Sequence, residues 1–363
     1  MKICLLGNNL TNFVLANVLA NKKLNVDIFY TQNLILRKNE SSRTLAISSD
    51  NYVYLKENNK KLNVSAWPTK KIKIYVEKKK SEELFEFINK DKNNFFLIKY
   101  DEIYDFFLKN LKKNKYIKFI KLKNNNTKLF FKKNYNLIIN SEPKSHITKK
   151  FFYKRLEKSY NSLAYTFLIT HKRLQNNIAM QIFTKHGPLA FLPLSNSQTS
   201  IVFSCKSSHK IQKQEIKKII KKFNNKYEIK KFGKLENFTL KFSMLRNYYY
   251  KNILSFGDLI HRIHPLVGQG FNMTIRDIKI LSFLIDERIK LGLELDSSIL
   301  YDFQNKTKHL NYIFGSSVNL IYDFFKLDNK FNNSLSTSIF AILRKNKFLN
   351  KYANYFADNG IKI

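Results

Sequence analysis

Glycine, proline and cysteine are scarce in this chain of 363 residues, which contains 9 Gly, 5 Pro and 2 Cys. The two cysteines, Cys4 and Cys205, are too few for a small scaffold held together by disulfides. No window approaches the ~20 consecutive apolar residues that cross a bilayer, and the apolar run at the N-terminus is too short for a signal peptide. We therefore expect a cytoplasmic protein, either free or attached peripherally to the inner face of the membrane.

Acidic residues are also scarce, with 27 Asp and Glu against 65 Lys and Arg, for a formal charge of +38. The excess lysines are scattered along the whole chain. Two explanations stay open: a compositional bias at every exposed position, or attraction to an anionic membrane surface. Proteins that bind nucleic acid usually gather their basic residues on one face or in a tail. The scatter therefore predicts no specific nucleic-acid partner.

A strand–helix–strand unit opens the chain. Residues 2–6 form a short apolar run, helical spacing follows, and residues 25–30 are a second apolar run. A dinucleotide-binding loop between such elements has the pattern G-x-G-x-x-G and is followed by an acidic residue after the second strand. Here Gly7 holds the first position, Asn9 and Asn12 hold the other two, and the acidic residue is absent. The unit is either a modified cofactor loop or a plain structural one.

Glycine and proline gather in residues 257–277, after an apolar run at 253–256 that predicts a buried strand. Four of them lie there: Gly257, Pro265, Gly268 and Gly270. After Asn272 the pattern turns helical. Glycine lets the backbone approach a ligand closely, and the N-terminus of a helix offers unpaired N–H groups. The stretch therefore predicts an anion or cofactor site, in which Asp258 accepts hydrogen bonds from ligand hydroxyls.

The rest of the chain supplies one further site candidate and a change of architecture. Arg43 lies in a Ser/Thr-rich setting before what the pattern predicts to be an apolar helix start, so it either contacts a phosphate or is a solvated residue near a helix cap. Residues 116–122 and 127–131 predict a hairpin. Between residues 164 and 203, alternating apolar runs predict an antiparallel sheet and hence a second domain.

With these pieces placed, the chain resembles the ubiquinone-biosynthesis hydroxylases, a branch of the class A flavoprotein monooxygenases related to p-hydroxybenzoate hydroxylase. Residues 257–277 are similar to the family pattern G-D-x-x-H-x-x-x-P-x-x-G-x-G-x-N, and Arg276-Asp277 completes the match. The R-x-L-A-x-S run that begins at Arg43 is similar to another family motif, as are residues 181–183 with 187–194. Residues 356–360 resemble the branch's usual ending.

The resemblance implies an α/β fold (α+β overall): a doubly wound, Rossmann-like FAD-binding domain interrupted by an antiparallel-sheet substrate domain, with a helical C-terminal segment. The expected boundaries are 1–70, 95–150 and 245–295 for the FAD-binding domain, 71–94 and 151–244 for the substrate domain, and 296–363 for the C-terminal segment.

The resemblance also implies how FAD is held. Asp258 would bind the ribityl chain, the Gly268–Gly270 backbone would face the isoalloxazine, and Gly7 and Arg43 would address the pyrophosphate. The full set of candidate cofactor-binding residues is Gly7, Asn9, Arg43, Asp258, Pro265, Gly268, Gln269, Gly270 and Asn272. No catalytic side chain is predicted, because the flavin carries the chemistry. No metal is predicted either, since His261 and His264 lack Cys or carboxylate partners at ligand spacing.

The implied activity is hydroxylation of the aromatic ring of a polyprenylated phenol in ubiquinone biosynthesis. Such enzymes use NAD(P)H, O₂ and a flavin hydroperoxide. A basic and apolar segment at 340–355 would lie on an anionic bilayer or pack on its own protein. Other quinone-biosynthesis proteins are further candidate partners. Because Ser141-Glu142 replaces the family's Asp-Gly motif and the first loop keeps only one of its three glycines, the alternative is a catalytically impaired subunit that binds or scaffolds a quinone-biosynthesis complex.

Overall fold

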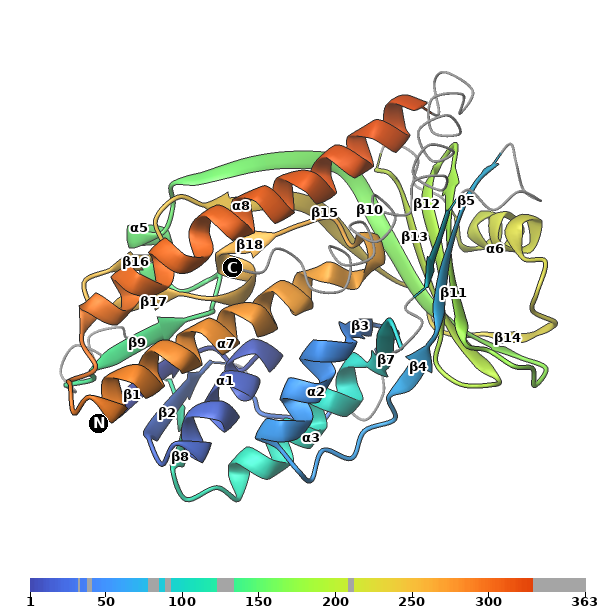
Figure 1. Ribbon diagram of the computed structural model, residues 1–363. Coiled ribbons are helices and arrows are strands. Elements are labelled where there is room, and N and C mark those ends of the chain that lie inside the picture. The colour runs from blue at the N-terminus through green and yellow to red at the C-terminus, as the bar shows by residue number, and fades with distance from the viewer. Residues whose placement is uncertain are drawn as a thin grey trace.

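The computed structural model describes residues 1–328 except for 32, 38–40, 78–84, 89–92, 123–133 and 208–211. The two C-terminal predictions, at 340–355 and 356–360, and the second half of the predicted hairpin lie outside the described residues. A mostly parallel sheet with its helices forms one half of the molecule and a large, mainly antiparallel sheet forms the other (Figure 1). This architecture agrees with the predicted fold class.

The first sheet has the strand order β16-β17-β9-β1-β2-β8. Its parallel members are β1 (Lys2–Leu6), β2 (Asn25–Tyr30), β8 (Ile117–Lys121), β9 (Leu137–Asn140) and β17 (Ile253–Ser255), and β16 (Tyr249–Tyr250) pairs antiparallel with β17. β1, β9 and β17 are continuous apolar runs because both of their faces are buried. The predicted strand–helix–strand unit is confirmed, with α1 (Leu10–Asn21) as its helix.

The first segment of the predicted hairpin forms β8. It pairs in parallel with β2, from Val26 with Ile117 to Tyr30 with Lys121. The second segment, 127–131, lies outside the described residues, so the hairpin itself stays a prediction.

A three-stranded sheet connects the two halves. It has the order β3-β7-β4, with β3 (Thr44–Ser48), β7 (Phe95–Lys99) and β4 (Trp67–Thr69), and is accompanied by α2 (Ser49–Asn58) and α3 (Tyr100–Lys112). The helix start predicted after Arg43 is wrong, because those residues form β3 and the helix begins only at Ser49. Antiparallel pairing of β3 with β7 overrides the local pattern.

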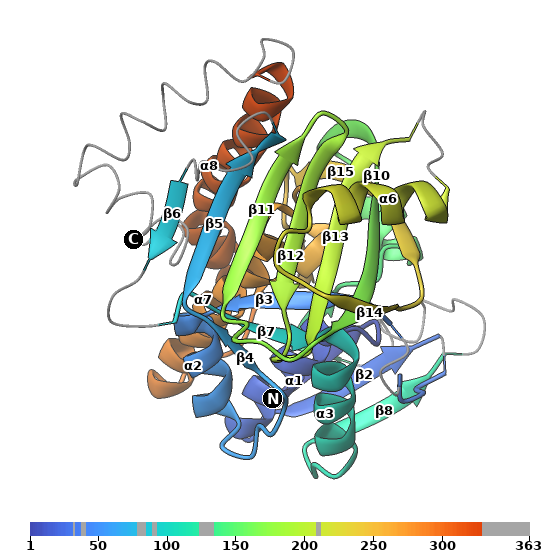
Figure 2. The same cartoon turned by 90° about the vertical axis from the view of Figure 1, so that its right-hand side faces the viewer.

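The large sheet has the order β18-β15-β10-β13-β12-β11-β5-β6, and β14 pairs with β10. Its strands are β5 (Lys71–Val76), β6 (Phe85–Ile88), β10 (Arg155–His171), β11 (Ile178–Thr184), β12 (Gly187–Pro193), β13 (Gln198–Lys206), β14 (Ile229–Phe232), β15 (Glu236–Leu245) and β18 (His261–Arg262). α6 (Lys213–Phe223) covers one face and α8 (Ser297–Asp328) crosses behind the other (Figure 2). A short helix, α5 (His146–Phe151), precedes β10.

Two long helices run past both sheets. α7 (Gln269–Lys290) packs in the core of the parallel sheet, and α8 packs there through Phe303 and against the large sheet through Phe314 and Phe325 (Figure 1). No helix in the described part of the chain combines the length and the apolar character needed to span a bilayer. The arrangement brings the N-terminus of α7 between the parallel sheet and the large sheet, where the sequence predicts the cofactor.

Candidate cofactor site

The N-terminus of α7 is open to a ligand. The short 3₁₀ helix η3 (Leu266–Gly268) leads into it, and Gly268 adopts a left-handed conformation with φ of +64°. A Cβ added to Gly268 would lie 2.9 Å from the Cβ of Ala46, so glycine is needed for contact with β3. At Gly270 an added Cβ would meet no atom within 4 Å, and no side chain caps the helix. The first turn of α7, which is the positive end of the helix dipole, therefore faces open space at Gly270.

α7 begins earlier than the sequence indicates. The apolar pattern predicted a helix after Asn272, whereas the helix starts at Gln269. Gly270 and Asn272 thus lie in its first turn and not in a loop. The buried positions of the first turn are the polar residues Gln269 and Asn272, so the start of the helix shows no apolar periodicity.

The side chain of Asn272 holds β3 against α7. Its Nδ2 donates to the carbonyl oxygen of Ala46 at 2.8 Å, and its Oδ1 accepts from the backbone N–H of Ser48 at 2.9 Å and from Asn51 Nδ2 at 3.1 Å. The residue is only 1% exposed. Asn272 is predicted to bind the cofactor; its side-chain hydrogen bonds hold the protein beside the Gly268–Gly270 turn, and a direct contact with FAD stays a prediction.

The first loop is closed by its own side chains. Gly7 has φ of +108°, and Asn9 caps α1 by accepting from the backbone N–H of Asn12 at 3.1 Å. Asn9 Nδ2 also donates to Ser141, at 2.8 Å to Oγ and 3.2 Å to the carbonyl oxygen. Asn9 and Ser141 are both departures from the family pattern, and they contact each other directly. We call this contact the Asn9–Ser141 bridge.

Asp258 lies beside the same loop. It belongs to the 3₁₀ helix η2 (Gly257–Leu259), which follows β17 and the buried residue Phe256. Gly257 has φ of +63°, and a Cβ there would lie 2.8 Å from Thr11 Cγ2 on α1. This close packing places Asp258 next to the first turn of α1, with its side chain exposed. The carboxylate is thus available to accept hydrogen bonds from a ligand.

Two arginines lie over a tyrosine pair beside the first loop. The guanidinium of Arg43 is 4.4 Å from the ring centre of Tyr100, and that of Arg37 is 4.5 Å from the ring of Tyr104. The Tyr104 hydroxyl donates to the carbonyl oxygen of Asn8 at 3.2 Å, which ties the pair to the loop. Sequence reasoning found Arg43 but missed Arg37, because a single arginine in an irregular loop carries no pattern.

The two histidines of the Gly-rich stretch do not converge. His261 Nε2 lies 2.7 Å from Asp277 Oδ2 in a buried pair, whereas the His264 ring packs between Tyr160 and Tyr322, with centroid distances of 5.1 and 4.3 Å. Burial lowers the pKa of His264 to about 3, so its ring is neutral at physiological pH. In the described ranges no three His, Cys, Asp or Glu side chains gather as metal ligands would.

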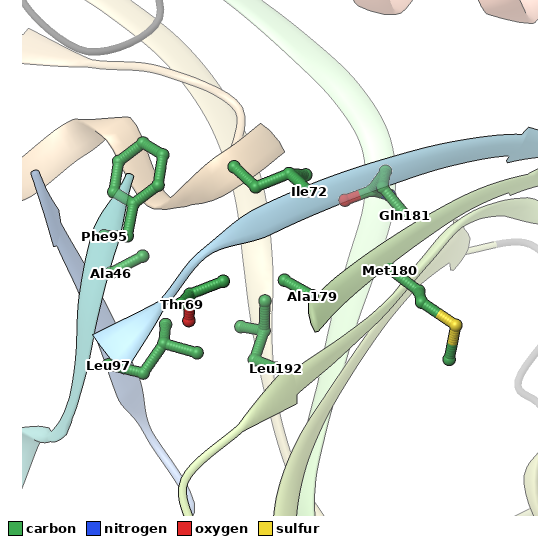
Figure 3. Close-up of a pocket in the computed structure, with 9 residues that line it drawn as sticks. All are labelled: Ala46, Thr69, Ile72, Phe95, Leu97, Ala179, Met180, Gln181 and Leu192. Atoms are coloured by element: carbon green, nitrogen blue, oxygen red, sulfur yellow. The ribbon is translucent and has the colours of Figure 1, made fainter. Parts of the chain in front are cut away.

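A small pocket lies between the three-stranded sheet and the large sheet; its cavity volume of about 20 Å³ is enough for roughly one water molecule. Its lining is mainly apolar and includes Ala46, Ile72, Phe95, Leu97 and Leu192. Thr69 and Gln181 contribute its polar side chains (Figure 3). Ala46 also lies against Gly268, so the pocket adjoins the open turn of α7.

Comparisons with known proteins agree with this geometry. Residues 154–290 match the family model described as FAD binding domain. The ubiquinone biosynthesis monooxygenase COQ6 of Dictyostelium discoideum is 23% identical over 193 residues, which cover 43% of this chain and 38% of the relative. The 3-demethoxyubiquinol 3-hydroxylase of Escherichia coli is 28% identical over 149 residues, covering 39% and 38%. Over these stretches the chain is similar to the ubiquinone-biosynthesis hydroxylases.

The structural comparison shows the same fold in a solved monooxygenase. The crystal structure of p-nitrophenol 4-monooxygenase PnpA from Pseudomonas putida superposes with a TM-score of 0.77 at 10% identity and covers 99% of this chain and 98% of its own. The sequence matches to the ubiquinone-biosynthesis hydroxylases span less than half of those relatives. The predicted family resemblance and the predicted cofactor, FAD, are confirmed.

The described residues fit FAD unevenly. The end expected to face the isoalloxazine offers free space at Gly270, a helix without a cap and a neighbouring apolar pocket. The end expected to face the pyrophosphate is a loop whose capping N–H at Asn12 is already satisfied by Asn9. Among the residues predicted for FAD, Gly7, Asn9, Arg43 and Asp258 gather around the start of α1, while Pro265 to Asn272 gather at the start of α7. Their direct contacts with FAD stay predictions.

The Asn9–Ser141 bridge predicts an unusual gain of affinity. Asn9→Gly removes the amide from the loop and frees the Asn12 N–H for a phosphate oxygen, so we expect FAD to bind about tenfold more tightly, the equivalent of one net hydrogen bond. Glycine is also a good cap, so the free energy of unfolding should fall by only a few tenths of a kcal/mol. Titration of FAD fluorescence measures the affinity.

Asn9→Ala is the matched control for this substitution. It opens the bridge equally but leaves α1 uncapped, at about 1 kcal/mol of stability. If Asn9 instead holds FAD directly, as the sequence predicts, both variants would bind FAD more weakly than the wild type. The sign of the change therefore separates the two roles.

Proposed function

We propose that this protein is an FAD-dependent monooxygenase that hydroxylates the aromatic ring of a polyprenylated phenol in ubiquinone biosynthesis, with NAD(P)H as electron donor and O₂ as oxidant. One observation carries the proposal: in a relative of the ubiquinone-biosynthesis hydroxylases, the uncapped first turn of α7 faces free space at Gly270 and adjoins an apolar pocket. FAD placed there would have its ring beside the apolar side chains that line this small pocket.

The chain's own residues have separate tasks in this proposal. Asp258 accepts hydrogen bonds from the ribityl hydroxyls, and Arg43 and Arg37 supply positive charge for the pyrophosphate. The positive end of α7 stabilises negative charge on the reduced ring. FAD, when bound, supplies the activation of O₂. The apolar side chains around the pocket, among them Phe95 and Leu97, would keep water away from the ring.

A substrate with a polyprenyl tail would come from a membrane. The charge of +38 would attract the protein to an anionic bilayer. We propose a cytoplasmic protein attached peripherally to the inner face of the membrane. Association with other quinone-biosynthesis proteins would bring substrate and product to neighbouring steps. Binding to vesicles with and without anionic lipid, at increasing salt, measures the electrostatic part of this attraction.

The activity is tested in two steps. The purified protein should show a flavin absorption spectrum, and a protein that neither carries FAD nor changes FAD fluorescence on titration would contradict the proposal. In cells from which the protein is removed, the quinone intermediates are then profiled by mass spectrometry. We expect a polyprenylated phenol to accumulate, and its structure identifies the ring position that is hydroxylated.

A second candidate function is a catalytically impaired subunit that binds or scaffolds a quinone-biosynthesis complex. The Asn9–Ser141 bridge favours it, because the bridge occupies the loop that would receive the pyrophosphate. The two functions differ in the rescue experiment. If the protein is a scaffold without catalysis, the Asp258→Ala variant returned to the depleted cells would restore ubiquinone. If the protein is the monooxygenase, this variant would not restore it.

A further inference from the structure

The outward side of α8 carries large apolar side chains. Over the last half of the helix these are Ile313, Leu320, Ile321 and Leu327, which are 52%, 66%, 46% and 53% exposed, together with the half-buried Phe324. Helical positions that are three, four and seven apart lie on one side. The five side chains therefore form a continuous line about 21 Å long, which we call the α8 stripe.

The opposite side of α8 packs on the protein. Gly315 lies so close to the large sheet that an added Cβ would collide with Met244 on β15. Phe314, Val318 and Phe325 fill the cluster under that sheet. A surface helix that packs through one side usually carries polar residues on the other, and this chain has 65 Lys and Arg to supply them. The apolar outward side is an exception to that composition, and it indicates a partner.

The charges around the α8 stripe indicate the kind of partner. Asp323, the sole acidic residue between positions 303 and 327 of the sequence, pairs with Lys158 at 2.6 Å. Lys306 and Lys326 are exposed near the two ends of the stripe. Two copies that each carry a charge of +38 repel each other, whereas anionic lipids attract the protein. Apolar side chains flanked by basic groups are typical of a helix that lies in the interface of a bilayer.

The inner side of the same part of α8 reaches the Gly-rich stretch. The ring of Tyr322 stacks on the ring of His264 with a centroid distance of 4.3 Å, and His264 directly precedes Pro265 and η3. Farther along, Phe325 stacks on Phe183 of β11 at 3.5 Å. α8 runs along the outside of both sheets (Figure 1). The width of one helix, about 10 Å, therefore separates the α8 stripe from the segment that leads into the first turn of α7.

We propose that the α8 stripe inserts into the boundary between headgroups and acyl chains of an anionic bilayer and anchors the protein there. The choice of a membrane as partner rests on the proposed function, to which the stripe adds the surface and the orientation: the side of the molecule near the start of α7 would lie next to the lipid. Salt removes an attraction that is due to net charge alone, but it does not weaken the burial of apolar side chains. A stripe that inserts therefore gives a part of the binding that resists salt.

Two pairs of leucines test the proposal in the full chain. The stripe variant combines Leu320→Gln with Leu327→Gln. The matched control combines Leu291→Gln with Leu293→Gln, because these leucines are 70% and 43% exposed but lie between α7 and α8, outside the stripe. Each protein is sedimented with vesicles of phosphatidylcholine and phosphatidylglycerol at low and at high salt. Thermal unfolding and light scattering without vesicles measure the stability and the mass of the same proteins.

We expect the wild type and the control to stay bound at high salt, and the stripe variant to bind at least about tenfold more weakly there, with unchanged unfolding temperature and mass. Wild-type binding that high salt abolishes would overturn the proposal and leave the attraction by net charge standing. Equal binding of the stripe variant and the wild type at high salt would also overturn it. If the stripe variant instead unfolds earlier or breaks a wild-type dimer while its vesicle binding is unchanged, the stripe packs on protein. The flavin spectrum of each sample reports separately whether the protein holds FAD, on which the proposed function depends.

Discussion

Asp258→Ala is expected to lose FAD while the protein stays folded. The carboxylate is exposed at the end of β17, next to the first turn of α1. A hydrogen bond to a charged group contributes about 1.5–3 kcal/mol, so two ribityl hydroxyls donating to Asp258 would account for a loss of affinity of about 100-fold or more. An exposed side chain with no structural task changes the free energy of unfolding by less than about 0.5 kcal/mol. FAD titration and urea unfolding measure the two quantities on the same preparation.

Asp302→Ala provides the matched control. Asp302 is also a partly exposed carboxylate, but it pairs with Arg288 at 3.3 Å on the surface, away from the candidate site. Removing a surface ion pair costs at most about 1 kcal/mol of stability, and FAD should bind as it does to the wild type. If Asp258→Ala keeps its FAD, the placement of the ribityl chain at η2 is wrong.

Asn272→Ala is expected to lower the free energy of unfolding by about 3 kcal/mol, because it leaves the Ala46 carbonyl, the Ser48 N–H and the Asn51 amide unpaired in the core and opens a small cavity. The loss arises where β3 meets α7, so the Gly268–Gly270 turn is released as well. Equilibrium unfolding in urea without FAD isolates this effect from any contribution of the cofactor.

The comparison for Asn272 is Asn319→Ala. Asn319 is half-buried on α8 and donates a single side-chain hydrogen bond to Asp323, four residues along the helix. Pairs of this kind contribute about 0.2–0.5 kcal/mol, so the control should unfold almost as the wild type does. An Asn272→Ala variant with wild-type stability and weakened FAD binding would show instead that Asn272 contacts the cofactor directly, as the sequence predicts.

Local patterns in the sequence were sufficient for β1, β9 and β17 and for the position of the Gly-rich turns. β1, β9 and β17 are apolar runs because they are buried on both faces, and the left-handed conformations at Gly257 and Gly268 coincide with the glycines that the pattern singled out. These features depend on neighbours in the chain. They can therefore be predicted without knowing the rest of the fold.

Features that depend on distant neighbours could not be predicted. Asn9 and Ser141 are 132 residues apart, and nothing local in either segment indicates that two substitutions in the family pattern satisfy each other. Arg37 reaches Tyr104 across 67 positions of the chain for the same reason. The Asn272 amide can form hydrogen bonds with a ligand or with the backbone, so the residue type alone does not predict which of the two it contacts.

α8 links the stability of the two halves of the molecule. At 32 residues it extends over about 48 Å, and it contributes Phe303 to the core beneath the parallel sheet and Phe314 and Phe325 to the cluster under the large sheet. Neither sheet can lose its packing without exposing apolar surface on this shared helix. A substitution that loosens α8 on one sheet is therefore expected to weaken its packing on the other sheet as well.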